Sequence, residues 1–254
     1  KLEFQFVAVD FLRDVEIHLG ARKFTYSVFT TRLPESPVDV YFVHCPALYH
    51  HDSIYSGEWD EYLRYALLTR VALESCQRMG WAPDIVHVHD WHTALAPIYL
   101  RTIYAWDRLF AKTRTALTLH NLAYQGVFAT QILDEIGLAC HIEMLFNEDL
   151  AAGRVSFLKT GLLYADALTT VSRTYAREIQ TPEHGFGLDP LLRARADHLS
   201  GIVNGVDYGE WSPESDPYIP HKYSAERLEG KEATKRALLE KIGLPVPRQA
   251  PVLG

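Results

Sequence analysis

The stretch Asp84-Ile-Val-His-Val-His-Asp-Trp-His92 sets the architecture that we expect for this chain. Its isoleucine and valines favour a short buried strand. Polar residues then follow at once, with His89 and Asp90 at the strand end, and the apolar segment 94–99 after them indicates a helix. Because α/β proteins bind ligands outside the carboxyl ends of parallel strands, this stretch predicts one edge of a functional site.

The same order of strand and helix continues to about residue 203. We expect strands at residues 84–89, 115–120, 167–171 and 199–203, with helices at residues 91–104, 155–164, 173–180 and 187–195. This alternation predicts an α/β fold, a Rossmann-like parallel sheet with helices on both faces. Each strand ends in hydrogen-bonding residues, so we expect these ends to gather at one edge of the sheet.

The segments on either side of this region have simpler patterns. Before residue 84, period-two alternation predicts strands around residues 24–28 and 38–45, and a four-residue apolar repeat predicts a helix at 59–79, capped by Gly80. After residue 204, the proline-rich segment 211–220 predicts a loop, and residues 232–242 predict a helix.

The two ends of the chain suggest how it divides into domains. The chain begins at Lys1 within a strand-like alternation, and residues 245–251 have the proline-rich composition of a linker. We therefore expect residues 1–244 to form one domain that is truncated at its start. Residues 245–254 are expected to be a linker and the first residues of another domain.

Composition excludes several classes of partner. The 254 residues carry a formal net charge of −7 with no run of basic residues, so nucleic acid and anionic membranes are poor partners. No apolar run approaches the roughly 20 residues of a spanning helix. Cys45, Cys76 and Cys140 show no paired spacing, which favours a reduced, cytoplasmic setting.

The histidines of the opening stretch raise the alternative of a metal-dependent hydrolase. His87, His89 and His92 could bind zinc together with Asp90. However, Trp91 separates Asp90 from His92, whereas the HxHxDH pattern of metallohydrolases has these two residues adjacent. We therefore interpret His87 as a hydrogen-bonded core histidine, and Asp90, at the strand end, as the functional residue.

A second dense stretch is Thr118-Leu-His-Asn-Leu-Ala-Tyr-Gln-Gly126. Its first residues continue the strand, and asparagine and glycine predict a loop after it. Histidine, asparagine, tyrosine and glutamine offer directional hydrogen bonds and a stacking face, which is typical of a sugar site. The chain has no GxSxG nucleophile motif and no glycine-rich phosphate loop.

Four stretches together resemble the family of bacterial glycogen synthases and plant starch synthases: IVHVHDWHTALAPIYLR, TLHNLAYQGVF, SFLKTGLLYADALTTVSRTYAREIQTPEHGFGL and LSGIVNGVDYGEWSPESD. The resemblance implies a GT-B glycosyltransferase, of which this chain is the N-terminal, acceptor-side half. It implies retaining transfer of glucose from ADP-glucose or UDP-glucose to the non-reducing end of an α-1,4-glucan. It implies no metal and no cofactor.

The resemblance also assigns roles to single residues. His120 matches the active-site histidine beside the donor glucose, and Asp90 matches the aspartate near the acceptor hydroxyl. The implied substrate-binding residues are Asn204, which matches a contact to the transferring glucose, with Asn121, Tyr49 and Gln125. The glycine-rich loop that opens the family and the basic residues that bind the donor diphosphate lie outside this sequence, so we expect the chain alone to be inactive.

Two rivals remain from other classes. One is a non-catalytic α-glucan-binding domain, and the other is the metal-dependent hydrolase. The sequence leaves open the choice between ADP-glucose and UDP-glucose, between glycogen and starch as product, and the oligomeric state.

Overall fold

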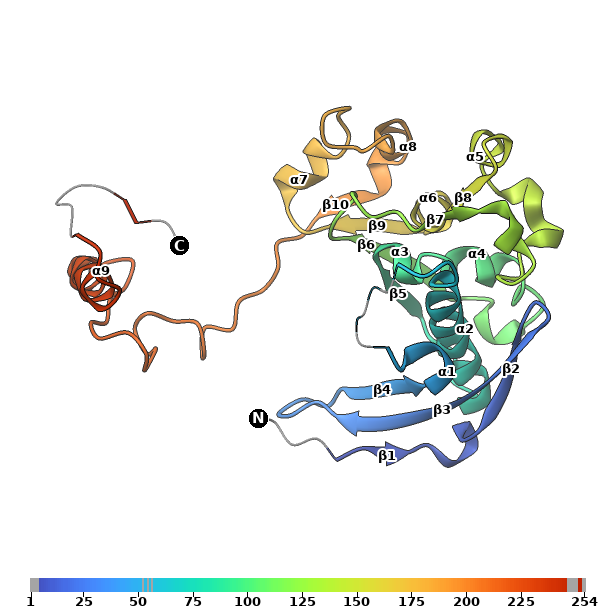
Figure 1. Cartoon of the computed structure of the whole chain (residues 1–254), viewed down its shortest axis with the longest axis horizontal. Helices are drawn as coiled ribbons and strands as arrows, with labels where there is room; N and C mark the ends of the chain where they lie inside the picture. The colour runs from blue at the N-terminus through green and yellow to red at the C-terminus, as the bar shows by residue number, and fades with distance from the viewer. Residues whose placement is uncertain (1–4, 52, 54, 56, 246–250, 253–254) are drawn as a thin grey trace. The chain divides into compact units, whose positions relative to one another are not determined.

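The computed structural model describes residues 5–51, 53, 55, 57–245 and 251–252. The chain divides into two compact units, residues 1–203 and residues 204–254. The first unit contains a parallel sheet, an antiparallel sheet and the helices that pack on them (Figure 1).

Four parallel strands form the sheet that the sequence predicts. Their order is β10 (Leu199–Gly201), β9 (Ala167–Thr170), β6 (Arg114–Leu119) and β5 (Ile85–His89). On one face of this sheet the apolar side chains are buried, with Leu117 and Leu168 fully inaccessible. The α/β class and the parallel sheet are therefore confirmed, although β10 is shorter than expected.

Helices connect these strands in chain order: α3 (Asp90–Thr93), α4 (Ala96–Arg101), α6 (Phe157–Tyr164), α7 (Arg173–Glu178) and α8 (Asp189–Ala194). Because the strands follow one another across the sheet, right-handed connections place these helices on a single face. Burial agrees, since Val88 is 6% exposed whereas Ile85, on the other face, is 63% exposed. The second helical layer expected on that face is not found among the described residues.

The antiparallel sheet precedes the parallel one in the chain. Its strands are β1 (Val7–Ala8), β2 (Val15–Leu19), β3 (Arg22–Arg32) and β4 (Asp39–His44), and β3 pairs with the other three. The period-two segments are thus confirmed as strands, while residues 1–4 lie outside the described residues.

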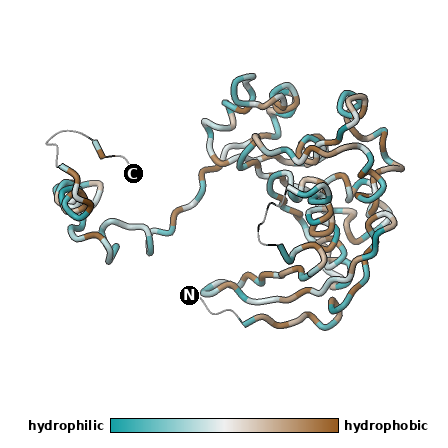
Figure 2. The backbone as a smooth tube through the Cα atoms, viewed as in Figure 1, coloured by the Kyte–Doolittle hydropathy of each residue, from teal (hydrophilic) through white to brown (hydrophobic). Residues whose placement is uncertain are grey.

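The long helix α2 (Tyr62–Met79) follows α1 (Pro46–Tyr49) and begins three residues later than expected. Its apolar residues, which Figure 2 shows in brown, join the core with both sheets. Gly80 ends the helix in the left-handed conformation, with φ of 61°, as predicted.

Two predicted helices are altered by local hydrogen bonding. The helix expected at 91–104 is divided into α3 and α4, because the Thr93 hydroxyl bonds to the backbone of His89 and Pro97 opens a new first turn. The helix expected at 155–164 begins only at Phe157. Ser156 caps this helix by accepting a hydrogen bond from the Lys159 N–H at 3.2 Å. Ser156 is itself the last residue of a short strand rather than part of the helix.

The remaining elements of the first unit are short. β7 (Val127–Ala129) pairs with β8 (Arg154–Ser156), and α5 (Asn147–Ala151) precedes β8. The 3-10 turns are η1 (Asp10–Leu12), η2 (Arg108–Phe110), η3 (Thr130–Leu133), η4 (Ala139–Met144) and η5 (Ala196–His198).

The second unit contains one helix among its described residues, α9 (Glu229–Lys241), which begins three residues earlier than expected. Gly243, with φ of 72°, follows its end, and residues 211–220 form turns and bends, as predicted. Compact packing thus changes at residue 204, whereas the sequence suggested a boundary near 245. The expected domain ranges, 1–244 and 245–254, stay predictions, and residues 246–250 and 253–254 lie outside the described residues.

No helix in the described part of the chain is both long enough and apolar enough to cross a membrane.

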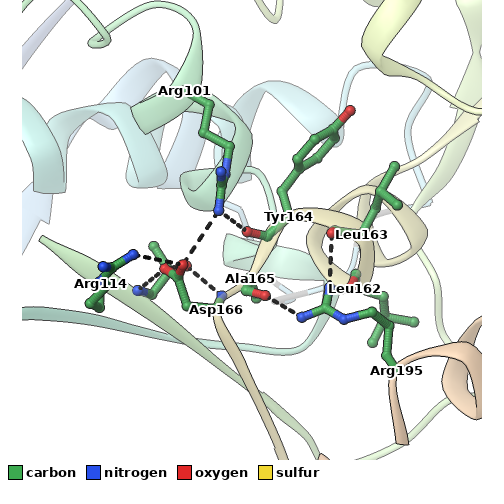
Figure 3. Close-up of polar contacts among 9 residues, drawn as sticks. Arg101, Arg114, Leu162, Leu163, Tyr164, Ala165, Asp166 and Arg195 are labelled. Carbon is green, nitrogen blue, oxygen red and sulfur yellow. Dashed lines mark hydrogen bonds and ion pairs between the residues drawn. The ribbon is translucent and has the colours of Figure 1, made fainter. Parts of the chain in front are cut away.

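An aspartate ties β6 to β9 at the edge of the sheet where these strands begin (Figure 3). Asp166 accepts hydrogen bonds from the N–H and hydroxyl of Thr115, both at 2.8 Å. Arg101 and Arg114 lie 3.4 and 3.5 Å from the other carboxylate oxygen. Nearby, Arg195 donates to three carbonyl groups at the end of α6, those of Leu162, Leu163 and Ala165.

We expect Asp166→Ala to lower the free energy of unfolding by about 2–3 kcal/mol at pH 7, because it leaves the Thr115 N–H without its charged partner. Burial alone would raise the pKa of Asp166, but its bonds to Thr115 and the two arginines outweigh burial and lower it. This stabilisation is therefore present above the unfolded pKa of about 3.9 and is lost as the pH falls through the folded pKa. Urea unfolding should show the largest difference from wild type at pH 7. Asp197→Ala, at an exposed aspartate, is the control, and an equal loss in both variants would contradict this account.

Candidate active site

Polar residues follow three neighbouring strands of the parallel sheet where each ends. His89 is the last residue of β5, and Asp90 follows it. His120 and Asn121 follow β6, and Ser172 lies just after β9. The strand register places His89 opposite Thr118, and Leu119 opposite Thr170, so these ends share one edge. The predicted gathering of the first three strand ends is thus confirmed, while Asn204 belongs to the second compact unit.

Asp90 links the ends of β5 and β6 directly. Its Oδ1 accepts the backbone N–H of His120 at 2.7 Å and that of Asn121 at 3.5 Å. Asp90 also has φ of 51°, a left-handed conformation that costs a residue with a side chain about 1 kcal/mol or more. The fold therefore accepts local strain at the residue that holds the backbone of His120.

The imidazoles of His89 and His120 are in hydrogen-bonding contact. Nδ1 of His89 lies 3.0 Å from Nε2 of His120, and the ring of His87 lies 4.4 Å from that of His89. Burial, with the neighbouring His87 and His120, lowers the pKa of His89. The neutral form of His89 is thereby favoured over the charged form.

His87 belongs to a hydrogen-bonded chain along the sheet. Its Nε2 lies 2.7 Å from the Thr118 hydroxyl, which lies 2.5 Å from that of Thr169. The prediction of a hydrogen-bonded histidine is confirmed, but the expectation that it lies in the core is wrong. His87 is exposed, because it lies on the face of the sheet that the described helices leave uncovered.

The histidines considered as zinc ligands do not converge. His92 lies at the end of α3, where its Nε2 is 3.0 Å from the Tyr55 hydroxyl and its ring stacks on Trp91. His89 instead contacts His120. Within residues 5–51, 53, 55, 57–245 and 251–252, no group of three or more His, Cys, Asp or Glu residues is arranged to hold a metal ion.

The loop after His120 is held by its own polar groups. Asn121 Oδ1 accepts the Ala123 N–H at 2.9 Å, and Gln125 Nε2 donates to the Phe186 carbonyl at 3.0 Å. Gly126 has φ of 58°, and a Cβ there would lie 2.3 Å from the Trp91 ring. Asn121 and Gln125 thus have structural partners, and their expected contacts with a glucan stay predictions.

A cavity of about 580 Å³ lies beside this loop. Aromatic side chains line much of it: Tyr55, Trp91, Tyr124 and Phe128, together with polar Glu61 and Gln125. Tyr124 is 67% exposed. Of these aromatic residues, the sequence analysis predicted only Tyr124 as part of a sugar site. Trp91 could also have been predicted, because it lies within the stretch 84–92 that marks the strand end.

The hydroxyl of Tyr49 has a structural partner on the long helix α2. The Tyr49 hydroxyl donates to the Arg64 carbonyl of α2 at 2.8 Å, and burial raises its pKa. Tyr49 belongs to the short helix α1, which the sequence did not predict and which packs against α2. The described contacts therefore join Asp90, His120 and Asn121, whereas the substrate roles of Tyr49 and Asn204 stay predictions.

Comparisons with known proteins show the family to which this chain is similar. The family model described as the starch synthase catalytic domain matches residues 3–194. The chain is 45% identical over 221 residues to the glycogen synthase of Koribacter versatilis, covering 85% of this chain and 45% of that protein. It is 43% identical over 232 residues to glycogen synthase 1 of Geobacter metallireducens, covering 89% and 46%.

A solved structure shares the fold. The catalytic domain of starch synthase IV from Arabidopsis thaliana, bound to ADP and acarbose, is 30% identical with a TM-score of 0.79, covering 96% of this chain and 50% of that one. The chain thus spans about half the length of the relatives it matches. It belongs to the glycogen and starch synthase family, as part of the starch synthase catalytic domain.

Proposed function

We propose that this chain is the acceptor-side half of a retaining GT-B glucosyltransferase that extends an α-1,4-glucan from ADP-glucose or UDP-glucose. The observation that carries the proposal is the contact between Asp90 and His120 at adjacent strand ends, within a chain that belongs to this family. A second domain would supply the cations that bind the donor diphosphate. The isolated chain is accordingly inactive in this proposal.

The chemistry required at this edge matches the residues found there. Glycosyl transfer passes through an oxocarbenium-like state, so dipolar or negative groups near the anomeric carbon lower its energy. In the proposal His120 lies beside the donor glucose and supports this charge. Asp90 holds the backbone of His120 and lies near the acceptor hydroxyl.

The same residues disfavour hydrolysis. A retaining glycosidase uses two carboxyl groups about 5 Å apart, one as nucleophile and one as acid. At the strand ends described above, Asp90 supplies one carboxylate, and it already accepts two backbone N–H groups. An acceptor sugar rather than water is therefore the second substrate in our account.

The relatives support the substrates that we propose. The starch synthase IV structure from Arabidopsis thaliana is bound to ADP and acarbose, which supports an adenine nucleotide donor and a glucan-like acceptor here. We place the acceptor over the aromatic cavity beside residues 121–126. Asn121, Gln125 and Tyr49 are proposed to contact sugar, and Asn204 the transferring glucose. The proposal uses no metal and no cofactor.

The alternative is a glucan-binding domain without catalysis, which the aromatic cavity would also serve. Two measurements separate the two functions. Isothermal titration of the isolated chain with maltoheptaose tests binding, and labelled ADP-glucose with glycogen tests transfer. The chain should then be joined to the C-terminal half of the Koribacter versatilis glycogen synthase and assayed again.

We expect no transfer by the isolated chain and transfer by the joined enzyme. Binding of maltoheptaose by the isolated chain, with no transfer in the joined enzyme, would favour the glucan-binding domain. Transfer by the isolated chain would contradict the proposal that a second domain is needed to bind the donor diphosphate.

A further inference from the structure

We infer that His89 is a positioning residue that fixes the ring orientation and the tautomer of His120. This inference rests on the proposed catalytic role of His120 and deepens it. The dipeptide His89-Asp90 ends β5 beside the end of β6. Asp90 holds the backbone of His120, and His89 holds its ring.

The ring contact restricts His120 in two ways. A hydrogen bond of 3.0 Å between Nδ1 of His89 and Nε2 of His120 limits rotation of the exposed His120 side chain. The bond also needs one donor and one acceptor. Because a neutral imidazole has one of each, the tautomer of His89 determines that of His120.

The surroundings of His89 keep it in its role as a neutral partner. The ring centroid of His87 lies 4.4 Å from that of His89, and Nε2 of His120 lies 3.0 Å from its Nδ1. The adjacent carboxylate of Asp90 would favour a charged His89. However, its Oδ1 accepts the backbone N–H of His120, just after β6. When Nδ1 of His89 carries no proton, it accepts a hydrogen bond from the N–H at Nε2 of His120, and this bond holds the His120 ring in one orientation.

His87 in turn orients His89. The hydroxyl of Thr118 holds Nε2 of His87 at 2.7 Å, and the two rings are tilted by 35°. The chain of contacts therefore runs from the sheet, through His87 and His89, to His120. Precise placement of a catalytic side chain requires neighbours that are themselves held in place, and His87 and Thr118 provide this for His89.

The geometry gives a test that separates positioning from general stability. The amide of asparagine reaches the place of imidazole Nδ1, whereas that of glutamine reaches the place of Nε2. Because His89 uses Nδ1, His89→Asn should retain the contact with His120, and His89→Gln should lose it, as His89→Ala does. In the joined enzyme we expect His89→Ala and His89→Gln to lower kcat about 10- to 100-fold. We expect a small change in the KM for ADP-glucose, and a kcat for His89→Asn within about threefold of wild type.

The isolated chain offers a readout that does not depend on catalysis. Imidazole ¹⁵N spectra should show one tautomer for His120 in the wild type and in His89→Asn, and a mixture in His89→Ala. His198→Ala, at an exposed histidine, is the control. Equal activity of the glutamine and asparagine variants, or an unchanged His120 tautomer in His89→Ala, would overturn the inference. If His120→Ala left transfer intact, the proposed function itself would fail, and the spectra would still report on the contact.

Discussion

Loss of the His120 imidazole should lower kcat of the joined enzyme about 10²- to 10³-fold, which is the usual effect of removing a group that stabilises transition-state charge. His120 is exposed at the end of β6, so its replacement by alanine should leave the fold intact. The KM for ADP-glucose should change much less than kcat, because the interaction strengthens as charge develops at the anomeric carbon. Initial rates of label transfer to glycogen provide the measurement.

His198→Ala provides the matched control, since His198 is also exposed and lies outside the site. Circular dichroism should be unchanged in both variants. A His120→Ala enzyme that retains more than about a tenth of the wild-type kcat would contradict the catalytic role.

Substitutions of Asp90 should separate its conformation from its charge. Asp90→Ala removes the acceptor of the His120 N–H and places alanine at φ of 51°, so we expect a loss of about 2–3 kcal/mol in unfolding free energy. We also expect a fall in kcat of about 10²-fold, because the backbone of His120 is released. Asp90→Gly removes the strain but also the acceptor, and should recover only the part of the stability that strain costs, without recovering kcat.

Asp90→Asn completes this comparison. Asparagine keeps an Oδ1 acceptor and tolerates the left-handed conformation, so its stability should stay within about 1 kcal/mol of wild type. If the acceptor is what matters, kcat should fall less than in Asp90→Gly. If Asp90→Gly matched wild type in kcat, the bond from Asp90 to His120 would have no catalytic importance. Unfolding in urea and label transfer measure the two quantities.

The sequence predicted the parallel sheet because its signal is local. Each strand is a short apolar run followed by a polar end, and the helices lie between them. It could not predict that the helix after Asp90 is divided, because that division depends on a bond from the Thr93 hydroxyl to His89. The uncovered face of β5 also escaped prediction, since an exposed Ile85 looks like a buried one in sequence.

The site was predictable where it depends on topology alone. Parallel strands that pair must bring their ends together, so the meeting of Asp90 with His120 followed from the order of the strands. The ring contact between His89 and His120 did not follow, because it depends on side-chain torsions. The short helix at residues 46–49 was not predicted either, although it directs the Tyr49 hydroxyl to the Arg64 carbonyl.

We propose that this edge of the sheet forms half of a retaining glucosyltransferase site. The most direct test is to incubate the joined enzyme with labelled ADP-glucose and glycogen, then to digest the product with β-amylase, which releases maltose from α-1,4-linked non-reducing ends. Our account predicts that the label enters glycogen and is released as maltose. Label that appears only as free glucose, or that is not released by β-amylase, would contradict it.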